Sequence, residues 1–120
     1  NLLMAVLEKR CHYEMGRMDA YVNIAGGIRM NEPALDLAIV MALISSYKDR
    51  PVNPKLLIFG EVGLSGEVRA VSEAEKRVHE AAKMGFHACI LPKVCADKMK
   101  PVAGMTLYGV SSVREAIGML

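Results

Sequence analysis

The chain has 120 residues, of which 52% are hydrophobic and 23% are charged, and its formal net charge is +2. This length suits one domain and is too short for two, and the apolar content excludes a wholly disordered protein. No apolar run reaches the ~18 residues that a membrane-spanning helix needs, and the N-terminus lacks the pattern of a secretory signal.

The first half of the chain predicts two helices separated by a strand. Residues 2–10 are strong helix formers that end in basic residues. Alternation over residues 21–24 predicts a strand, which resumes at residues 28–30 after a double glycine. Asn31, Glu32 and Pro33 predict the start of the next helix. This helix, over residues 34–47, is apolar on nearly every face, so we expect it to be the most buried one.

The second half predicts three strands, a hairpin and two helices. The continuous apolar run at residues 56–59 is typical of a strand covered on both faces. Leu64, Ser65 and Gly66 lie between two alternating stretches and predict a tight hairpin turn. Further strands are expected at residues 88–91 and 105–110, and residues 93–104 are expected to be mostly loop.

Two capping boxes predict where the last two helices begin. Ser72 with Glu75 opens a helix that runs to Met84, with Gly85 just beyond its end, and Ser112 with Glu115 opens the C-terminal helix. The resulting order of elements predicts an α/β or α+β domain with a mixed sheet, one β-hairpin and packed helices. Periodicity by itself indicates no activity.

Cysteine and histidine spacing gives no metal motif. Cys11, Cys89 and Cys95 are an odd set without a C-x-x-C pair, which favours free thiols in a reducing compartment over a zinc site or a disulfide framework. Cys89 lies inside an apolar strand and is expected to be inert packing. The histidines form no H-x-x-x-H pair. We therefore expect no metal ion in this domain.

Five collinear blocks carry a family resemblance. The longest is Phe59-Gly60-Glu61-Val62-Gly63-Leu64-Ser65-Gly66-Glu67-Val68-Arg69. The others are Tyr21-Val22-Asn23-Ile24-Ala25-Gly26-Gly27, Asp36-Leu37-Ala38, Asp49-Arg50-Pro51 and Glu80-Ala81-Ala82-Lys83-Met84-Gly85-Phe86. In order and spacing they resemble the C-terminal Lon-protease-like domain of the bacterial RadA (Sms) family, over nearly the whole chain.

This resemblance implies that residues 1–120 form a single Lon-like domain, excised from the C-terminal part of a longer protein. RadA proteins join a zinc finger and a RecA-like ATPase to this domain, and the ATPase forms hexameric rings that drive branch migration in DNA repair and recombination. The chain has neither the G-x-x-x-x-G-K-[ST] phosphate loop nor the four-cysteine motif. ATP, Mg²⁺ and Zn²⁺ are therefore expected only in the missing parts of the parent, and a bacterial cytoplasmic location without a membrane partner follows from the resemblance.

Lon-type proteases use a Ser–Lys dyad, in which a lysine of lowered pKa takes the proton of the hydroxyl. Matched to the family motif, the nucleophile position falls on Ala34 and the lysine position on Glu75. Lys76 is adjacent, but one residue along a helix turns a side chain by ~100°. Ala34 offers no nucleophile and Glu75 is anionic, so we expect no catalytic residue and a non-proteolytic domain.

Several charged residues have structural explanations beside functional ones. Asp36, within the apolar helix, is interpreted as a first-turn acid held by the helix dipole and by a backbone or arginine partner. Glu61 and Glu67 flank the hairpin, where pairing with Arg69 across the turn is expected. The apolar stripe of Leu2, Leu3, Val6 and Leu7 packs either on the domain or on the missing ATPase, two alternatives that remain open.

A basic face around the third helix is the candidate DNA contact. Its residues are Arg69, Lys76, Arg77 and Lys83, with Lys93, Lys98 and Lys100 in the following loop. An ordinary solvated helix face would have the same pattern. Contacts to phosphates would give salt-dependent, non-specific binding of duplex or branched DNA.

Three hypotheses follow. The first is an accessory domain that binds DNA weakly and helps a homo-oligomeric ring to assemble. The second is an oligomerisation or partner-docking scaffold without DNA contact. The third, an active peptidase, has little support because both dyad positions are changed.

Overall fold

A three-stranded parallel sheet forms the centre of the domain. The computed structural model describes residues 33–50 and 52–120. Its strands are β1 (Leu56–Ile58), β4 (Ala88–Pro92) and β5 (Thr106–Val110), in the order β1-β4-β5. Leu57 is in register with Cys89, and Cys89 with Leu107. The strands predicted at residues 56–59, 88–91 and 105–110 are thus confirmed within one residue at either end.

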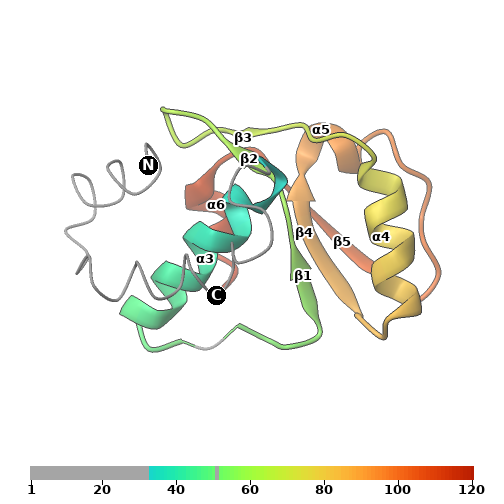
Figure 1. Ribbon diagram of the computed structural model, residues 1–120, viewed down its shortest axis with the longest axis horizontal. Coiled ribbons are helices and arrows are strands. Elements are labelled where there is room, and N and C mark those ends of the chain that lie inside the picture. The colour runs from blue at the N-terminus through green and yellow to red at the C-terminus, as the bar shows by residue number, and fades with distance from the viewer. Residues whose placement is uncertain (1–32, 51) are drawn as a thin grey trace.

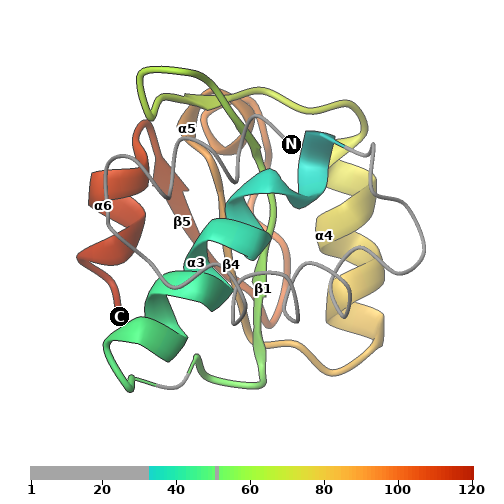
Figure 2. The ribbon, with the colours of Figure 1, turned by 60° about the vertical axis from the view of Figure 1, so that its left-hand side comes forward.

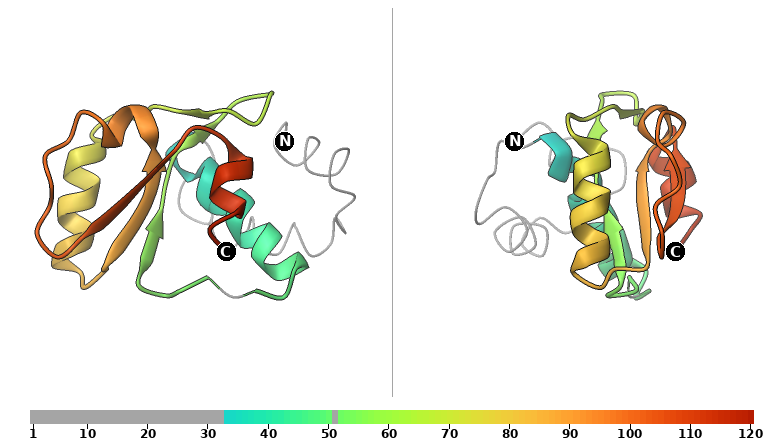
Figure 3. Two further views of the ribbon diagram at one scale, coloured as in Figure 1. Left: turned by 180° about the vertical axis from the view of Figure 1, so that it is seen from behind. Right: turned by 90° about the vertical axis from the view of Figure 1, so that its right-hand side faces the viewer.

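Helices cover both faces of this sheet (Figure 1). On one face lie α3 (Asp36–Tyr47) and α6 (Val113–Ile117), and on the other lie α4 (Ala74–Lys83) and the short α5 (Lys93–Ala96) (Figures 1 and 2). Figure 3 shows the same layers from behind, with the sheet between α3 and α4. Successive side chains of β4 point to opposite faces of the sheet, so this strand contributes to the hydrophobic core on each face. Cys89 packs with Val78 of α4, whereas Ile90 packs with Leu37 and Met41 of α3. The α/β fold class predicted from the sequence is confirmed.

Helix α3 is the buried helix that its apolar sequence predicts. A single 3₁₀ turn, η1 (Pro33–Leu35), leads into it, and seven of its residues are buried. The expected start also included Asn31 and Glu32, which lie outside the described residues. At the other end, Lys48 caps the helix and Asp49 adopts a left-handed conformation with φ 54°. The Ser45 hydroxyl donates to the carbonyl of Arg50, which closes this end.

The predicted hairpin is present as β2 (Glu61–Val62) and β3 (Val68–Arg69), paired antiparallel. Gly66 has φ 81°, a conformation that favours glycine, and its N–H donates to the carbonyl of Gly63 at 3.0 Å. A side chain at Gly63 would clash with the carboxylate of Glu67, which folds over the turn. The two glycines therefore allow the turn and the packing of Glu67 against it.

One of the two predicted serine N-caps is correct. The Ser112 hydroxyl accepts a hydrogen bond from the Glu115 N–H at 3.1 Å at the start of α6. The box predicted at Ser72 is wrong, because Glu73 takes the N-cap position of α4 in a left-handed conformation (φ 56°), with no side-chain cap bond. The helix begins one residue later than expected, so the Ser72 hydroxyl is not placed to cap it. Its end is as predicted, since Gly85 has φ 93° just after Met84.

Residues 93–104 are not all loop, because Lys93–Ala96 form α5. Cys95 of this helix is buried against the α4 side of the sheet, which explains why this short segment becomes helical. The predicted helix at residues 2–10 and the strands at residues 21–24 and 28–30 fall outside the described residues. Within the described part of the chain, no helix is long and apolar enough to cross a membrane.

Candidate functional site

The start of α3 holds the position that resembles the Lon nucleophile. Ala34 is 3% exposed, and its carbonyl accepts the Gly60 N–H at 2.9 Å. The Gly60 carbonyl in turn accepts the Leu37 N–H at 3.0 Å. These two bonds fix the segment after β1 against the first turn of the helix. Ala34 therefore has a packing and backbone role here.

Asp36 has the structural role expected of it. Its Oδ2 accepts the Val62 N–H at 3.1 Å, which joins α3 to the hairpin. Partial burial raises the pKa of this carboxyl above its ordinary value, the Val62 hydrogen bond lowers it, and the nearby Glu61 charge raises it. Because burial has the largest effect, the net direction is upward. The backbone partner predicted for Asp36 is confirmed.

Glu75, at the position that resembles the dyad lysine, is exposed in the first turn of α4. Its Oε1 lies 3.7 Å from Nε2 of His79, one helical turn along. The expectation that Glu75 caps the helix is therefore wrong, since the carboxylate is directed along the helix toward His79. Figures 1 and 2 show that α3 and α4 begin at the same end of the sheet. The two dyad-equivalent positions thus share an end of the molecule, where they supply a methyl group and a carboxylate.

The four cations predicted to bind DNA divide into two pairs. Arg69 lies 3.8 Å from Glu61 and 3.0 Å from Glu67, so the ion pairing predicted across the hairpin is confirmed. The pKa of the Glu67 carboxyl is lowered, first by a hydrogen bond from its own backbone N–H, then by the hydrogen bond from Arg69, and then by the Ser65 N–H. The Nε of Arg77 donates to the Ser72 carbonyl at 3.1 Å. Lys76 and Lys83 are exposed on α4, and Arg69 is exposed on β3 as well.

Exposed acids accompany these lysines. Glu75 and Glu80 of α4 are exposed beside Lys76 and Lys83, so this helix presents charges of both signs. In α5, Lys93 lies 3.5 Å from Asp97. Arg69 is paired with carboxylates and Arg77 with a backbone carbonyl, whereas Lys76 and Lys83 remain candidates for phosphate contact. DNA binding at this face stays a prediction.

Cys89 contributes to the core, as its sequence context predicts. Its side chain is fully buried, and burial raises the pKa of the thiol to about 12. A thiol of such high pKa is protonated at neutral pH and is a poor nucleophile. Within residues 33–50 and 52–120, no three metal-ligating side chains gather in one place.

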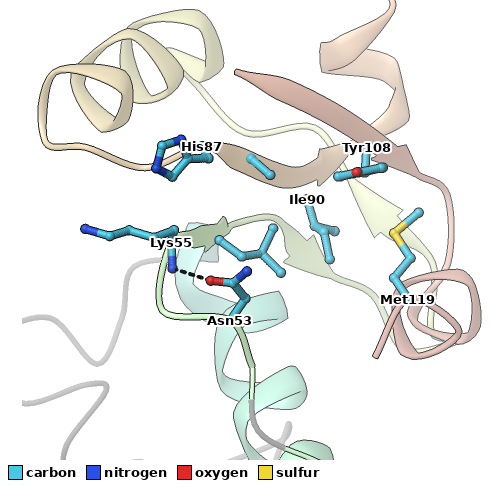
Figure 4. A pocket seen from close by; sticks show the side chains of 8 residues that line it. Asn53, Lys55, His87, Ile90, Tyr108 and Met119 are labelled. Atoms are coloured by element: carbon cyan, nitrogen blue, oxygen red, sulfur yellow. Dashed lines mark hydrogen bonds between the residues drawn. The ribbon is translucent and has the colours of Figure 1, made fainter. Parts of the chain in front are cut away.

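The sequence did not reveal a pocket that runs from the amino ends of β1 and β4 to the middle of β4 and β5 (Figure 4). Its volume is about 610 Å³. Apolar side chains form its floor and three polar residues its rim; the lining residues are Asn53, Lys55, Leu56, His87, Ala88, Ile90, Tyr108 and Met119. These residues come from separate parts of the chain, so no local pattern could have indicated the pocket.

Residues 3–94 match the family model described as subunit ChlI of Mg-chelatase. The chain belongs to this ChlI family.

Proteins of known name are similar to the chain over nearly its whole length. It is 50% identical over 117 residues to a DNA repair protein RadA of Bacillus subtilis and 45% identical to one of Halalkalibacterium halodurans. A RadA of Streptococcus pyogenes is 43% identical. Each alignment covers 98% of the chain but 26% of the relative, so the chain spans about a quarter of their length. The RadA resemblance inferred from the five sequence blocks is confirmed.

Proposed function

We propose that this ChlI-family chain is a non-proteolytic, Lon-like accessory domain of a RadA-like, ATP-dependent protein of DNA repair and recombination. In this proposal the domain contributes weak duplex or branched-DNA binding and takes part in assembling the ring that drives branch migration. ATP, Mg²⁺ and Zn²⁺ act in the rest of the parent protein, which works in the bacterial cytoplasm. The names and identities of the relatives support the parent's assignment.

The non-proteolytic part of the proposal rests on Ala34, the residue at the position equivalent to the nucleophile. Ala34 has no hydroxyl, is 3% exposed, and uses its carbonyl to bond the Gly60 N–H. A Ser–Lys mechanism needs a nucleophile that substrate can reach and a base beside it. At the other dyad position Glu75 is paired with His79, so neither partner of the mechanism is supplied.

Two exposed lysines support the DNA-binding part. Lys76 and Lys83 are seven residues apart on α4 and therefore lie on one face of the helix. Lysine ammonium groups on such a face bind phosphates through charge, without reading the base sequence. One domain with two such contacts would bind weakly, in the range of ~10⁻⁴ to 10⁻⁶ M typical of non-specific binding. Several copies on one ring would bind more tightly, because later contacts become intramolecular.

A salt titration in the full-length protein tests this contact. Replacing both Lys76→Glu and Lys83→Glu should lower duplex affinity and flatten the dependence of log K on log salt concentration. Arg77 stays unchanged, because its Nε bonds the Ser72 carbonyl. The matched control is Lys48→Glu with Arg114→Glu, which reverses two exposed charges on the α3 and α6 side of the sheet.

The alternative is a scaffold that assembles the ring or docks a partner without contacting DNA. The hairpin tip and the pocket favour it, because both expose apolar side chains at the surface. If the two double variants and the wild type give the same affinity and salt slope, the basic face is only a solvated surface. The scaffold would then replace the DNA-binding part of the proposal.

A further inference from the structure

The tip of the β2–β3 hairpin holds an apolar side chain out from the surface. Leu64 is 60% exposed at the turn. The Ser65 N–H donates to Oε1 of Glu67 at 3.0 Å, and the Gly63 N–H donates to the Glu67 carbonyl at 2.9 Å. The residues on either side of Leu64 are thus held by hydrogen bonds. A leucine on a stiff turn can enter a partner's surface at a small cost in conformational entropy.

The hairpin itself is fixed to the body of the domain at both ends. The Gly60 N–H bonds the Ala34 carbonyl, and the Val62 N–H bonds Asp36. On the return strand, the Gly66 carbonyl accepts the Val113 N–H at 2.9 Å. These bonds hold the hairpin against the starts of α3 and α6, so the position of Leu64 is determined by the fold.

The pocket offers a surface that complements this tip. Its apolar lining includes Ile90, which is buried, and Tyr108 and Met119, which are 42% and 44% exposed. Figure 4 shows the side chains of Tyr108, Met119 and Ile90 at one end and Lys55 and His87 at the other. With a volume of about 610 Å³, the pocket has room for a leucine together with adjoining turn residues.

Charge also matches between the two surfaces. The hairpin carries the carboxylates of Glu61 and Glu67 and the single cation Arg69, so it has an acidic excess. The pocket rim carries Lys55 and His87, and none of its eight lining residues is acidic. An acidic hairpin is therefore attracted to this rim, and like charges are not brought together.

One copy of the chain cannot make this contact with itself. The hairpin follows the carboxyl end of β1, whereas Lys55 and His87 precede the amino ends of β1 and β4. The Lys55 and His87 rim therefore lies at the opposite end of the parallel sheet from the hairpin, and the bonds to Ala34 and Asp36 prevent the hairpin from folding back. A contact between unlike surfaces of identical copies generates a ring or an open filament.

We propose that Leu64 at the hairpin tip of one copy docks in the pocket lined by Ile90, Tyr108 and Met119 of the next copy. This inference rests on the ring assembly stated under the proposed function and names the surfaces that make it. The occupant of the pocket is a second copy of this chain, which supplies an apolar side chain flanked by carboxylates.

Sedimentation velocity over a range of concentrations tests the tip. Leu64→Asp should raise the dissociation constant for self-association at least about tenfold, as expected for a central apolar anchor. The control is Val94→Asp on α5, a similarly exposed apolar residue (50%) outside the pocket, which should leave the constant unchanged. Equal constants for wild type and Leu64→Asp would overturn the docking of Leu64.

A cross-link between copies tests the pairing of the two surfaces. Leu64→Cys protein and Met119→Cys protein, each also carrying Cys11→Ser, are purified separately, mixed and oxidised. A disulfide-linked dimer should form in the mixture faster than in either protein alone. It should also form faster than when Val94→Cys replaces Met119→Cys. Equal rates in all these mixtures would contradict the proposed contact.

The outcomes separate this inference from the function on which it rests. If the wild-type chain assembles with the same dissociation constant as Leu64→Asp, and the Leu64→Cys and Met119→Cys mixture cross-links no faster than the mixture with Val94→Cys, another surface builds the ring. If the chain stays monomeric at every concentration, both the hairpin contact and the domain's part in ring assembly are wrong. Normal assembly, with losses of stability in Leu3→Asp and Met119→Asp that are non-additive in the double variant, would place the chain's own N-terminal stripe in the pocket, which also overturns the contact between copies.

Discussion

Ser72 and Ser112 each precede a helix, but only the Ser112 hydroxyl caps one. It accepts the Glu115 N–H at 3.1 Å, whereas α4 has no side-chain cap bond. Ser112→Ala should therefore lower the free energy of unfolding by about 1 kcal/mol, the usual cost of losing an N-cap hydroxyl. Chemical denaturation of the chain measures this change.

Ser72→Ala is the matched control for this measurement. Ser72 lies before the helix, and its carbonyl, which the substitution keeps, is the group that accepts Nε of Arg77. We expect its free energy of unfolding to stay within about 0.5 kcal/mol of the wild type, as for most surface substitutions. Equal losses in the two variants would contradict the observed start of α4.

The raised pKa of Asp36 predicts a pH-dependent stability. Burial raises its folded pKa above the ordinary value of 3.8, so the folded state holds its proton to higher pH than the unfolded state. The contribution of Asp36 to the free energy of unfolding is therefore fully present below pH 3.8 and is lost as pH rises through the folded pKa.

Asp36→Asn removes this titration and keeps an oxygen that can accept the Val62 N–H. Between about pH 3 and about pH 6, the variant should gain stability relative to the wild type, because only the wild type must ionise a partly buried carboxyl. Urea denaturation of both proteins at each pH gives the difference. A difference that is constant with pH, or that changes in the opposite direction, would show that burial does not dominate at Asp36.

At the scale of the element, α3 and its C-cap are followed by an unfavourable residue. Asp49 follows the C-cap with φ 54°, a conformation that costs a residue with a Cβ about 1 kcal/mol, and its charge faces the negative end of the helix dipole. Asp49→Gly removes both costs, so we expect the free energy of unfolding to rise by about 0.5 to 1 kcal/mol.

The neighbouring Lys48 supplies the control for this change. It has φ −85°, which suits any residue, and Lys48→Gly should lower the free energy of unfolding by about 0.5 to 1 kcal/mol. Thermal melting of the two variants should thus shift in opposite directions. Shifts of the same sign would mean that the effect comes from glycine itself and not from the backbone conformation of Asp49.

At the scale of the whole molecule, the dyad positions predict that the domain does not cleave protein. Neither the chain nor its Ala34→Ser variant should degrade unfolded casein above a blank. The hydroxyl introduced by this substitution would be buried beside the Gly60 bond, and Glu75 would still supply no lysine. Release of acid-soluble peptides from labelled casein measures this activity. Turnover by the purified wild-type chain would show that a nucleophile elsewhere is active.

Local sequence determined the elements whose cause is local. The apolar run at residues 56–59, the glycine at 66 and the Ser112 capping box each predicted a feature that is present, because strand burial, turn conformation and capping depend on neighbouring residues. The resemblance also assigned the dyad-equivalent positions to Ala34 and Glu75, and this assignment stays a prediction.

Tertiary structure decided what depends on residues that are distant in sequence. The packing of Cys95 made Lys93–Ala96 helical, and the left-handed Glu73 moved the start of α4 past Ser72. The pairing of Arg69 with Glu61 and Glu67 became visible only in the folded chain, because composition does not show which cations have an acidic partner. The strand order and the pocket also required the folded chain, because parallel strands pair across long connections and bring residues of four segments together.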